Sequence, residues 1–184
     1  MEQSKTSSQS AALTLTVLAA LARLVPHPPN FAPIGAAALF GGARLRGWQA
    51  YAVPLLAMLV TDPILNWMHG VHTLSVMTLV IYGCFLVNVV LGRAFLRKTN
   101  SIPRIATVAV LGSLQFFVIT NFFVWLGARD IYPPTSSGLV ACYIAAIPFF
   151  AWTVLGDLLY SGVLFTVYAL YTRRLTAASS GQHA

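Results

Sequence analysis

The sequence predicts an all-α integral membrane protein, built as one bundle of six transmembrane helices. Hydrophobic residues make up 58% of its 184 residues, whereas charged residues make up only 8%. Long stretches contain no Lys, Arg, Asp or Glu, and the longest of them covers residues 63–92. A helix needs roughly 20 mostly apolar residues to cross about 30 Å of hydrocarbon. The chain therefore has room for six such segments and for no separate soluble domain.

Proline and charged residues mark where the expected helices begin and end. The run from Pro26 to Asn30 ends the first helix, because proline cannot continue a helix. Helices are expected over about residues 10–25, 33–45, 48–67, 72–96, 102–126 and 138–174. They form a single domain over residues 10–174, between a disordered N-terminus (1–9) and a flexible tail (175–184).

Two of these segments do not have the length of a single span. The segment 33–45 would measure roughly 20 Å at about 1.5 Å per residue, which is less than the membrane thickness. The loop before it is therefore expected to dip into the membrane or to cap a cavity. The stretch 138–174 is too long for one span, so Pro148 is expected to separate a short outer helix from the sixth transmembrane helix.

The distribution of basic residues predicts the orientation of the bundle. Cytoplasmic loops of membrane proteins carry an excess of Lys and Arg. If the N-terminus is cytoplasmic, Arg23 and Arg129 are outside, and the other basic residues are inside. The inner set is Lys5, Arg44, Arg46, Arg93, Arg97, Lys98, Arg104, Arg173 and Arg174. Both termini are therefore predicted to be cytoplasmic. This topology explains the formal charge of +7, and no nucleic-acid partner is expected.

The predicted outer face collects polar and aromatic residues above an apolar bundle. The candidate ligand-binding residues there are His27, Asn30, Asp62, Trp67, His72, Tyr132 and Tyr143. Such a cluster is typical of the mouth of a ligand pocket. His27, His69 and His72 with Asp62 could also hold a metal ion, since imidazole and carboxylate suit several divalent ions. Their spacing is not diagnostic, however, and no independent metal is predicted.

Asp157 and Cys84 are chemically active residues within expected membrane helices. Asp157 lies well inside the sixth helix, where an ionisable group is costly and indicates a functional site; the alternative is a structural pair with Asn121 or a backbone group. Cys84 lies about 12 residues below His72. Its thiol is either a small buried hydrophobe or a soft ligand for a transition metal inside a larger cofactor. Asp62 could likewise accept hydrogen bonds from loop amides or contact a ligand.

The first helix carries a stripe of small residues, Ala12, Thr16 and Ala20, at four-residue spacing. Such stripes let two helices approach closely in lipid, so this one could receive a partner helix or pack inside the bundle. The sequence contains no nucleotide-binding motif of the G-x-x-x-x-G-K-[ST] type. The protein is therefore not expected to couple ATP hydrolysis by itself.

Several motifs resemble those of a known family of small bacterial membrane proteins. They are residues 24–36 (LVPHPPNFAPIGA), 39–42 (LFGG), 120–122 (TNF), 132–133 (YP), 138–143 (GLVACY), 146–149 (AIPF) and 155–160 (LGDLLY). With them the chain resembles, over roughly residues 10–174, the substrate-binding S components of energy-coupling-factor (ECF) vitamin transporters. The resemblance implies a six-helix S-component fold in the bacterial cytoplasmic membrane, with an outward-facing vitamin site.

Within this family the chain most resembles the vitamin B12 branch, the BtuM-like transporters. That resemblance implies that cobalamin is the bound and transported substrate, held by the outer loop residues and Asp157. It also implies that the thiolate of Cys84 is an axial ligand to cobalt and assists removal of the upper cobalt ligand. The partners implied are an ECF coupling protein and its ATPases, docking through the first helix.

Three alternative functions remain open on the sequence alone. The first is an S component for another vitamin or a small precursor, in which Cys84 is structural. The second is a membrane-embedded enzyme that uses Asp157 and His27 in acid–base chemistry, although the two groups are expected at different depths. The third is a structural subunit of a helical bundle, which would bind no small molecule.

Overall fold

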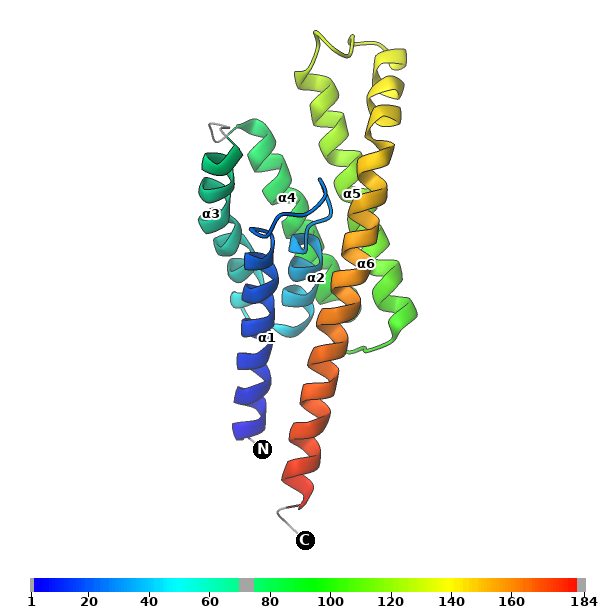
Figure 1. Cartoon of the computed structure of the whole chain (residues 1–184). Helices are drawn as coiled ribbons and strands as arrows, with labels where there is room; N and C mark the ends of the chain where they lie inside the picture. The colour runs from blue at the N-terminus through cyan, green and yellow to red at the C-terminus, as the bar shows by residue number, and fades with distance from the viewer. Residues whose placement is uncertain (1, 70–74, 182–184) are drawn as a thin grey trace.

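The computed structural model of the chain describes residues 2–69 and 75–181, and within these ranges every regular element is a helix. The elements are α1 (Glu2–Ala22), α2 (Ile34–Arg44), α3 (Gln49–His69), α4 (Val76–Leu91), the π-helical turn η1 (Gly92–Leu96), α5 (Ile102–Gly127) and α6 (Ser136–Gly181). The helices run alternately up and down, so both termini lie at the same end of the bundle (Figure 1). The basic residues predicted to be cytoplasmic lie in the elements and loops at that end.

Four of these helical segments are long and apolar enough to cross a membrane: α3, α4 with η1, α5 and α6. α1 contributes a shorter apolar stretch, Thr6–Ala22, and α2 has only 11 residues. Several long apolar helices in one chain are typical of a multi-pass helical membrane protein. The six predicted helices are all present.

Two predicted boundaries are wrong. α1 begins at Glu2 rather than near residue 10, so residues 2–9 are helical and not disordered. α6 runs unbroken past Pro148 and through residues 175–181. A proline is tolerated inside a helix of this kind, because neighbouring side chains and small backbone adjustments satisfy the freed carbonyl. No proline or early glycine interrupts the chain after Arg174, and the helix therefore continues to Gly181.

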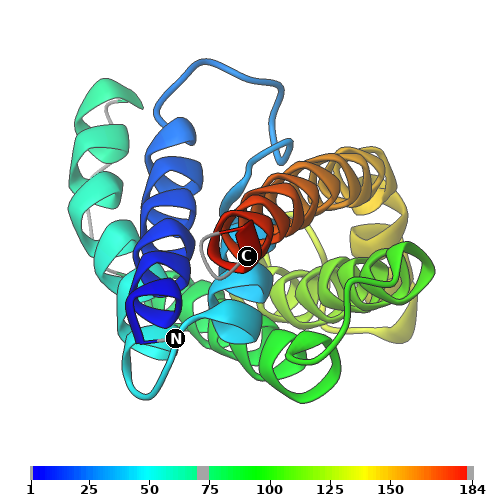
Figure 2. The ribbon, with the colours of Figure 1, turned by 90° about the horizontal axis from the view of Figure 1, so that it is seen from below.

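The short helix α2 is the centre of the bundle. It contacts each of the other helices, and ten of its eleven residues are buried (Figure 2). Glycine and alanine make up most of α2, which lets the surrounding helices approach its backbone closely. Phe40 fills the remaining space on one side, with its ring edge-on to Phe165 at a centroid distance of 5.2 Å. The N-terminal end of α2 lies inside the bundle, where Ile34 and Gly35 are buried.

Two glycines allow α2 and α4 to cross with their backbones in contact. A Cβ atom on Gly42 would collide with the backbone carbonyl of Val89, and one on Gly92 would collide with that of Leu39. Gly42 belongs to α2 and Gly92 is the first residue of η1, directly after α4, so each side of the crossing contributes one glycine. The lower end of α2 is fixed by Arg44, which donates hydrogen bonds to backbone carbonyls at the end of η1 and in the loop after it.

The small-residue stripe of α1 packs inside the bundle. Ala12, Thr16 and Ala20 are fully buried, and α1 contacts α2, α3 and α6. This stripe is therefore not available as a docking surface for a partner helix in the described structure. Cys84 and Cys142 are both buried and free, so no disulfide joins them.

Candidate functional site

A cavity of about 440 Å³ lies beside the central helix, beneath the loop between α1 and α2. Its walls come from that loop and from five helices, α2 to α6. The lining residues are Arg23, Leu24, Val25, Pro26, His27, Asn30, Ala32, Ile34, Gly35, Leu65, Met68, Ile81, Phe85, Asn88, Phe116, Thr153 and Asp157. The wall is mainly apolar, with a small number of polar groups. This is the usual composition of a small-molecule site.

The loop over residues 23–33 covers the cavity because its prolines prevent α1 from continuing. Its backbone turns at Asn30, which has a φ of 65° in the left-handed region that asparagine tolerates better than most residues. The chain then enters α2 through Pro33, whose fixed φ suits the start of a helix. The expectation that this loop caps a cavity is confirmed.

Asp157 is a buried polar group of the cavity wall. Its side chain is 3% exposed, and its Oδ2 atom accepts a hydrogen bond of 2.7 Å from the hydroxyl of Ser113 on α5. The backbone N–H of Ala36, in the first turn of α2, also donates to the carboxylate. Gly35 makes this possible, because a Cβ atom there would occupy the position of the carboxylate. Of the two structural partners considered for Asp157, Asn121 donates to the carbonyl of Phe117 instead, whereas the backbone partner is present as the N–H of Ala36.

A second polar contact joins α4 and α5 at the same cavity. The side-chain amide of Gln115 donates to Asn88 Oδ1 at 3.1 Å and to the backbone carbonyl of Cys84 at 3.0 Å. Asn88 packs against Gly112, where a Cβ atom would lie only 2.7 Å from its Oδ1. These contacts hold the Asn88 side chain at the cavity wall.

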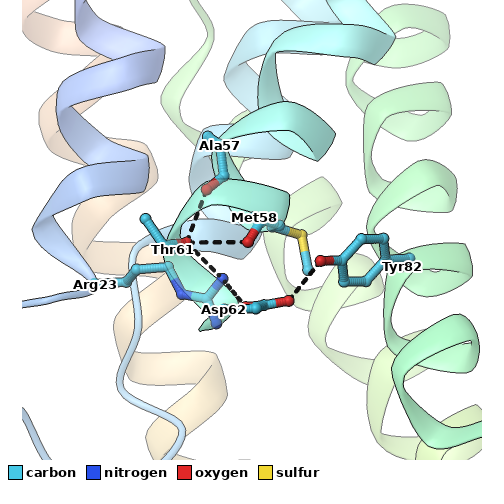
Figure 3. Close-up of polar contacts among 6 residues, drawn as sticks. All are labelled: Arg23, Ala57, Met58, Thr61, Asp62 and Tyr82. Carbon is cyan, nitrogen blue, oxygen red and sulfur yellow. Dashed lines mark hydrogen bonds and ion pairs between the residues drawn. The ribbon is translucent and has the colours of Figure 1, made fainter. Parts of the chain in front are cut away.

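A polar network joins the end of α1 to α3 and α4 at the edge of the cavity (Figure 3). Arg23 Nη1 lies 2.7 Å from Asp62 Oδ1 and 3.2 Å from Thr61 Oγ1. The hydroxyl of Tyr82 donates to Asp62 Oδ2 at 2.6 Å. Because both charged side chains are mostly buried, at 16% and 20% exposure, removing one partner leaves the other poorly solvated.

Replacing Tyr82 by phenylalanine is expected to lower the free energy of unfolding by about 1–2 kcal/mol, because Asp62 loses a hydrogen bond to a charged acceptor. Thermal unfolding of the detergent-solubilised protein measures the change. Tyr132→Phe is the matched control, since Tyr132 lies in the α5–α6 connection, outside this network. Equal unfolding temperatures for the two variants would show that the network does not hold α3 and α4 together.

The structure brings three of the predicted site residues together: His27, Asn30 and Asp157 line the cavity. Asp62 does not line it but neutralises Arg23, which does. Trp67, Tyr132 and Tyr143 lie elsewhere, with Trp67 84% exposed and the Tyr143 hydroxyl bonded to the carbonyl of Val118. His72 lies outside the described residues. Cys84 is buried but is not part of the cavity wall.

Sequence reasoning missed several residues of the wall. The polar ones are Arg23, Asn88 and Thr153, and the aromatic ones are Phe85 and Phe116. Asn88 had a usable signal, since it is the one amide in an otherwise apolar helix. Phe85 and Phe116 had none, because phenylalanine is as common on a lipid-facing surface as in a cavity. The sequence assigned Arg23 only to the outer side of the membrane and did not indicate that it lines a cavity.

One family profile matches nearly the whole chain. It covers residues 3–178 and is described as a family of unknown function, DUF6580. The chain belongs to the DUF6580 family. No curated protein and no solved structure matches the chain. The function of this DUF6580 protein must therefore be inferred from its cavity and its membrane architecture.

Proposed function

We propose that this DUF6580 protein binds a small organic solute in the cavity beneath the 23–33 loop and carries it across the membrane. The observation that supports this proposal is the cavity itself. Its volume of about 440 Å³ falls in the range of small-molecule sites, and a few polar groups, Asn88, Thr153 and Asp157 among them, converge on an apolar space. A bundle subunit with a purely structural role would have no use for such a space.

The position of the cavity favours transport over storage. The wall includes residues from α3, α4, α5 and α6, the four segments long enough to span a membrane. A solute held there would lie within the bundle, next to the 23–33 loop. The sequence resemblance to S components agrees with this role and adds a coupling protein with ATPases as the source of energy.

Cobalamin is the candidate solute that the resemblance suggests. One observation favours it: the buried thiol of Cys84 lies in the same turns of α4 as Ile81, Phe85 and Asn88, which line the cavity. Two observations oppose it. Cys84 is not part of the wall, and a whole corrin with its side chains is larger than the cavity. Cobalt binding would thus require α4 to turn and the cavity to widen, whereas a smaller vitamin or precursor fits without change.

The proposal is tested by incubating the detergent-purified protein with a panel of water-soluble vitamins and their precursors, including cobalamin. Bound solute is identified by mass spectrometry after gel filtration. We expect stoichiometric retention of one solute without chemical change. Conversion of a solute would instead support an enzyme that uses His27 and Asp157, which line the same cavity.

A cavity-filling variant shows where the solute binds. Ala32→Phe places a ring in the wall of the cavity, and Ala145→Phe makes the same change on an exposed position of α6. We expect Ala32→Phe to abolish retention and Ala145→Phe to keep it. Retention by both variants would place the solute elsewhere and contradict the proposal.

The role of Cys84 is decided by an absorption spectrum of the protein with cobalamin. If cobalamin is the solute, we expect the wild-type protein to retain it with a shifted spectrum, because a thiolate replaces the lower axial ligand of cobalt. Cys84→Ala should lose the shift. Cys142→Ala is the matched control, since Cys142 is also buried and free. Identical spectra for all three proteins would show that Cys84 is a packing residue.

A further inference from the structure

The cavity wall includes a carboxyl group, that of Asp157, which has no ion-pair partner among the described residues. Two charged side chains, Arg23 and Asp157, line it among the described residues. The charge of Arg23 is neutralised by Asp62 at 2.7 Å. Asp157 forms no ion pair with any Lys, Arg or His of the described chain. His27 also lines the wall, and its Nδ1 lies within hydrogen-bond distance of the Pro28 carbonyl, to which it can donate.

Polar contacts from the protein satisfy the Asp157 carboxylate only in part. A carboxylate can accept about four hydrogen bonds. Ser113 and the backbone N–H of Ala36 account for two of them. The N-terminus of α2 adds the equivalent of roughly half a positive charge, which is less than the charge of an ionised carboxylate. Asp157 also lines the cavity, so a bound solute can supply a further contact to this carboxyl group.

Aromatic rings stand on the same cavity wall. Phe85 of α4 and Phe116 of α5 both line it, with their ring centroids 5.4 Å apart and their planes inclined at 35°. The faces of such rings attract cations, and this attraction grows when water is excluded. The rings also offer a flat apolar surface to the body of a solute.

From these three observations together we infer that the cavity selects cationic solutes: a flat or aromatic body that carries a protonated nitrogen, paired with Asp157. This inference rests on the proposed function and specifies its substrate class. A protonated solute would provide the opposite charge that no Lys, Arg or His of the described chain provides to Asp157, and such a partner favours the ionised form of a buried carboxyl group. Anionic solutes are disfavoured by the same carboxylate.

Three probes with one ring system and different charges test the inference: tryptamine, tryptophol and indole-3-propionate. Their affinities for the full-length protein in detergent are measured by isothermal titration calorimetry. We expect tryptamine to bind at least about tenfold more tightly than tryptophol, since a charge-assisted hydrogen bond is roughly twice as strong as a neutral one. Indole-3-propionate is expected to bind most weakly.

Two variants separate the ligand role of Asp157 from its structural role. Asp157→Asn keeps the shape but removes the charge, and tryptamine and tryptophol should then bind equally. Ser113→Ala removes the hydrogen bond to Asp157 but leaves the carboxylate, and Ser113 is not part of the wall. It should keep the preference for tryptamine. The ranking of the probes on the wild-type protein tests the inference even if Asp157→Asn does not fold.

The possible failures are distinct. Equal affinities of the wild-type protein for tryptamine and tryptophol would overturn the cation preference and leave the proposed function intact. If Asp157→Asn still prefers tryptamine to tryptophol, a group other than Asp157 selects the cation, and the inference is overturned as well. A protein that binds none of the probes and no member of the vitamin panel has no binding site in this cavity, and the proposed function itself then fails.

Discussion

Gly92→Ala is expected to lower the free energy of unfolding by about 3 kcal/mol, the upper end of the usual cost of overpacking. The added methyl group would meet the backbone carbonyl of Leu39, and a backbone cannot rotate away as a side chain can. α4 and the central helix α2 must therefore separate along their crossing. Gly42→Ala should have a similar effect, because its methyl group would meet the carbonyl of Val89 at the same crossing.

A control variant, Gly83→Ala, and the double variant Gly42→Ala/Gly92→Ala show whether the loss of stability arises at this crossing. Gly83 lies in α4, the helix that directly precedes Gly92, and a Cβ atom there would meet nothing within 4 Å. Gly83→Ala should therefore leave stability unchanged or raise it by up to about 1 kcal/mol, the helix propensity of alanine over glycine. The double variant Gly42→Ala/Gly92→Ala should lose less unfolding free energy than the two single variants together, because either methyl group alone already forces the helices apart at this crossing. Thermal unfolding in detergent measures all four variants, and a wild-type stability for Gly92→Ala would refute the close crossing.

The sequence was sufficient to predict the helices but not how they surround α2. Charge-free stretches and prolines located each helix, because a membrane span has a fixed minimum length. The segment 33–45 was too short to span a membrane, and of the two expectations drawn from that length, a loop that dips into the membrane or caps a cavity, the second is confirmed. The boundaries failed at Glu2 and Pro148, where local polarity and proline suggested interruptions that the helices do not show.

The candidate site was predicted in part, and the difference has a physical reason. His27, Asn30 and Asp157 were found because polar groups near or within lipid are costly and therefore informative. Trp67 was selected by the same reasoning but is 84% exposed, since an aromatic residue at a helix end can serve at a membrane interface. Whether a side chain faces a cavity depends on how the helices are rotated. Cys84 and Phe85 are neighbours in sequence, yet only Phe85 is part of the wall.

The second large effect is expected at Gly35. In Gly35→Ala the new methyl group would occupy the position of the Asp157 carboxylate, which is 3% exposed. The carboxylate could move only by giving up its hydrogen bonds to Ser113 and to the N–H of Ala36. Because hydrogen bonds to charged groups contribute about 1.5–3 kcal/mol each, we expect a loss of about 3 kcal/mol in the free energy of unfolding. The preference for tryptamine over tryptophol should disappear as well.

A double-mutant cycle shows whether this cost arises from Asp157. With Asp157→Ala as the background the carboxylate is absent, so Gly35→Ala should cost little or nothing there. The coupling between the two positions should be at least about 2 kcal/mol, near the upper part of the range for residues in contact. Thermal unfolding of the four proteins in detergent gives this value. Additive effects would mean that Gly35 is needed for another reason, and that Asp157 is not held against the first turn of α2.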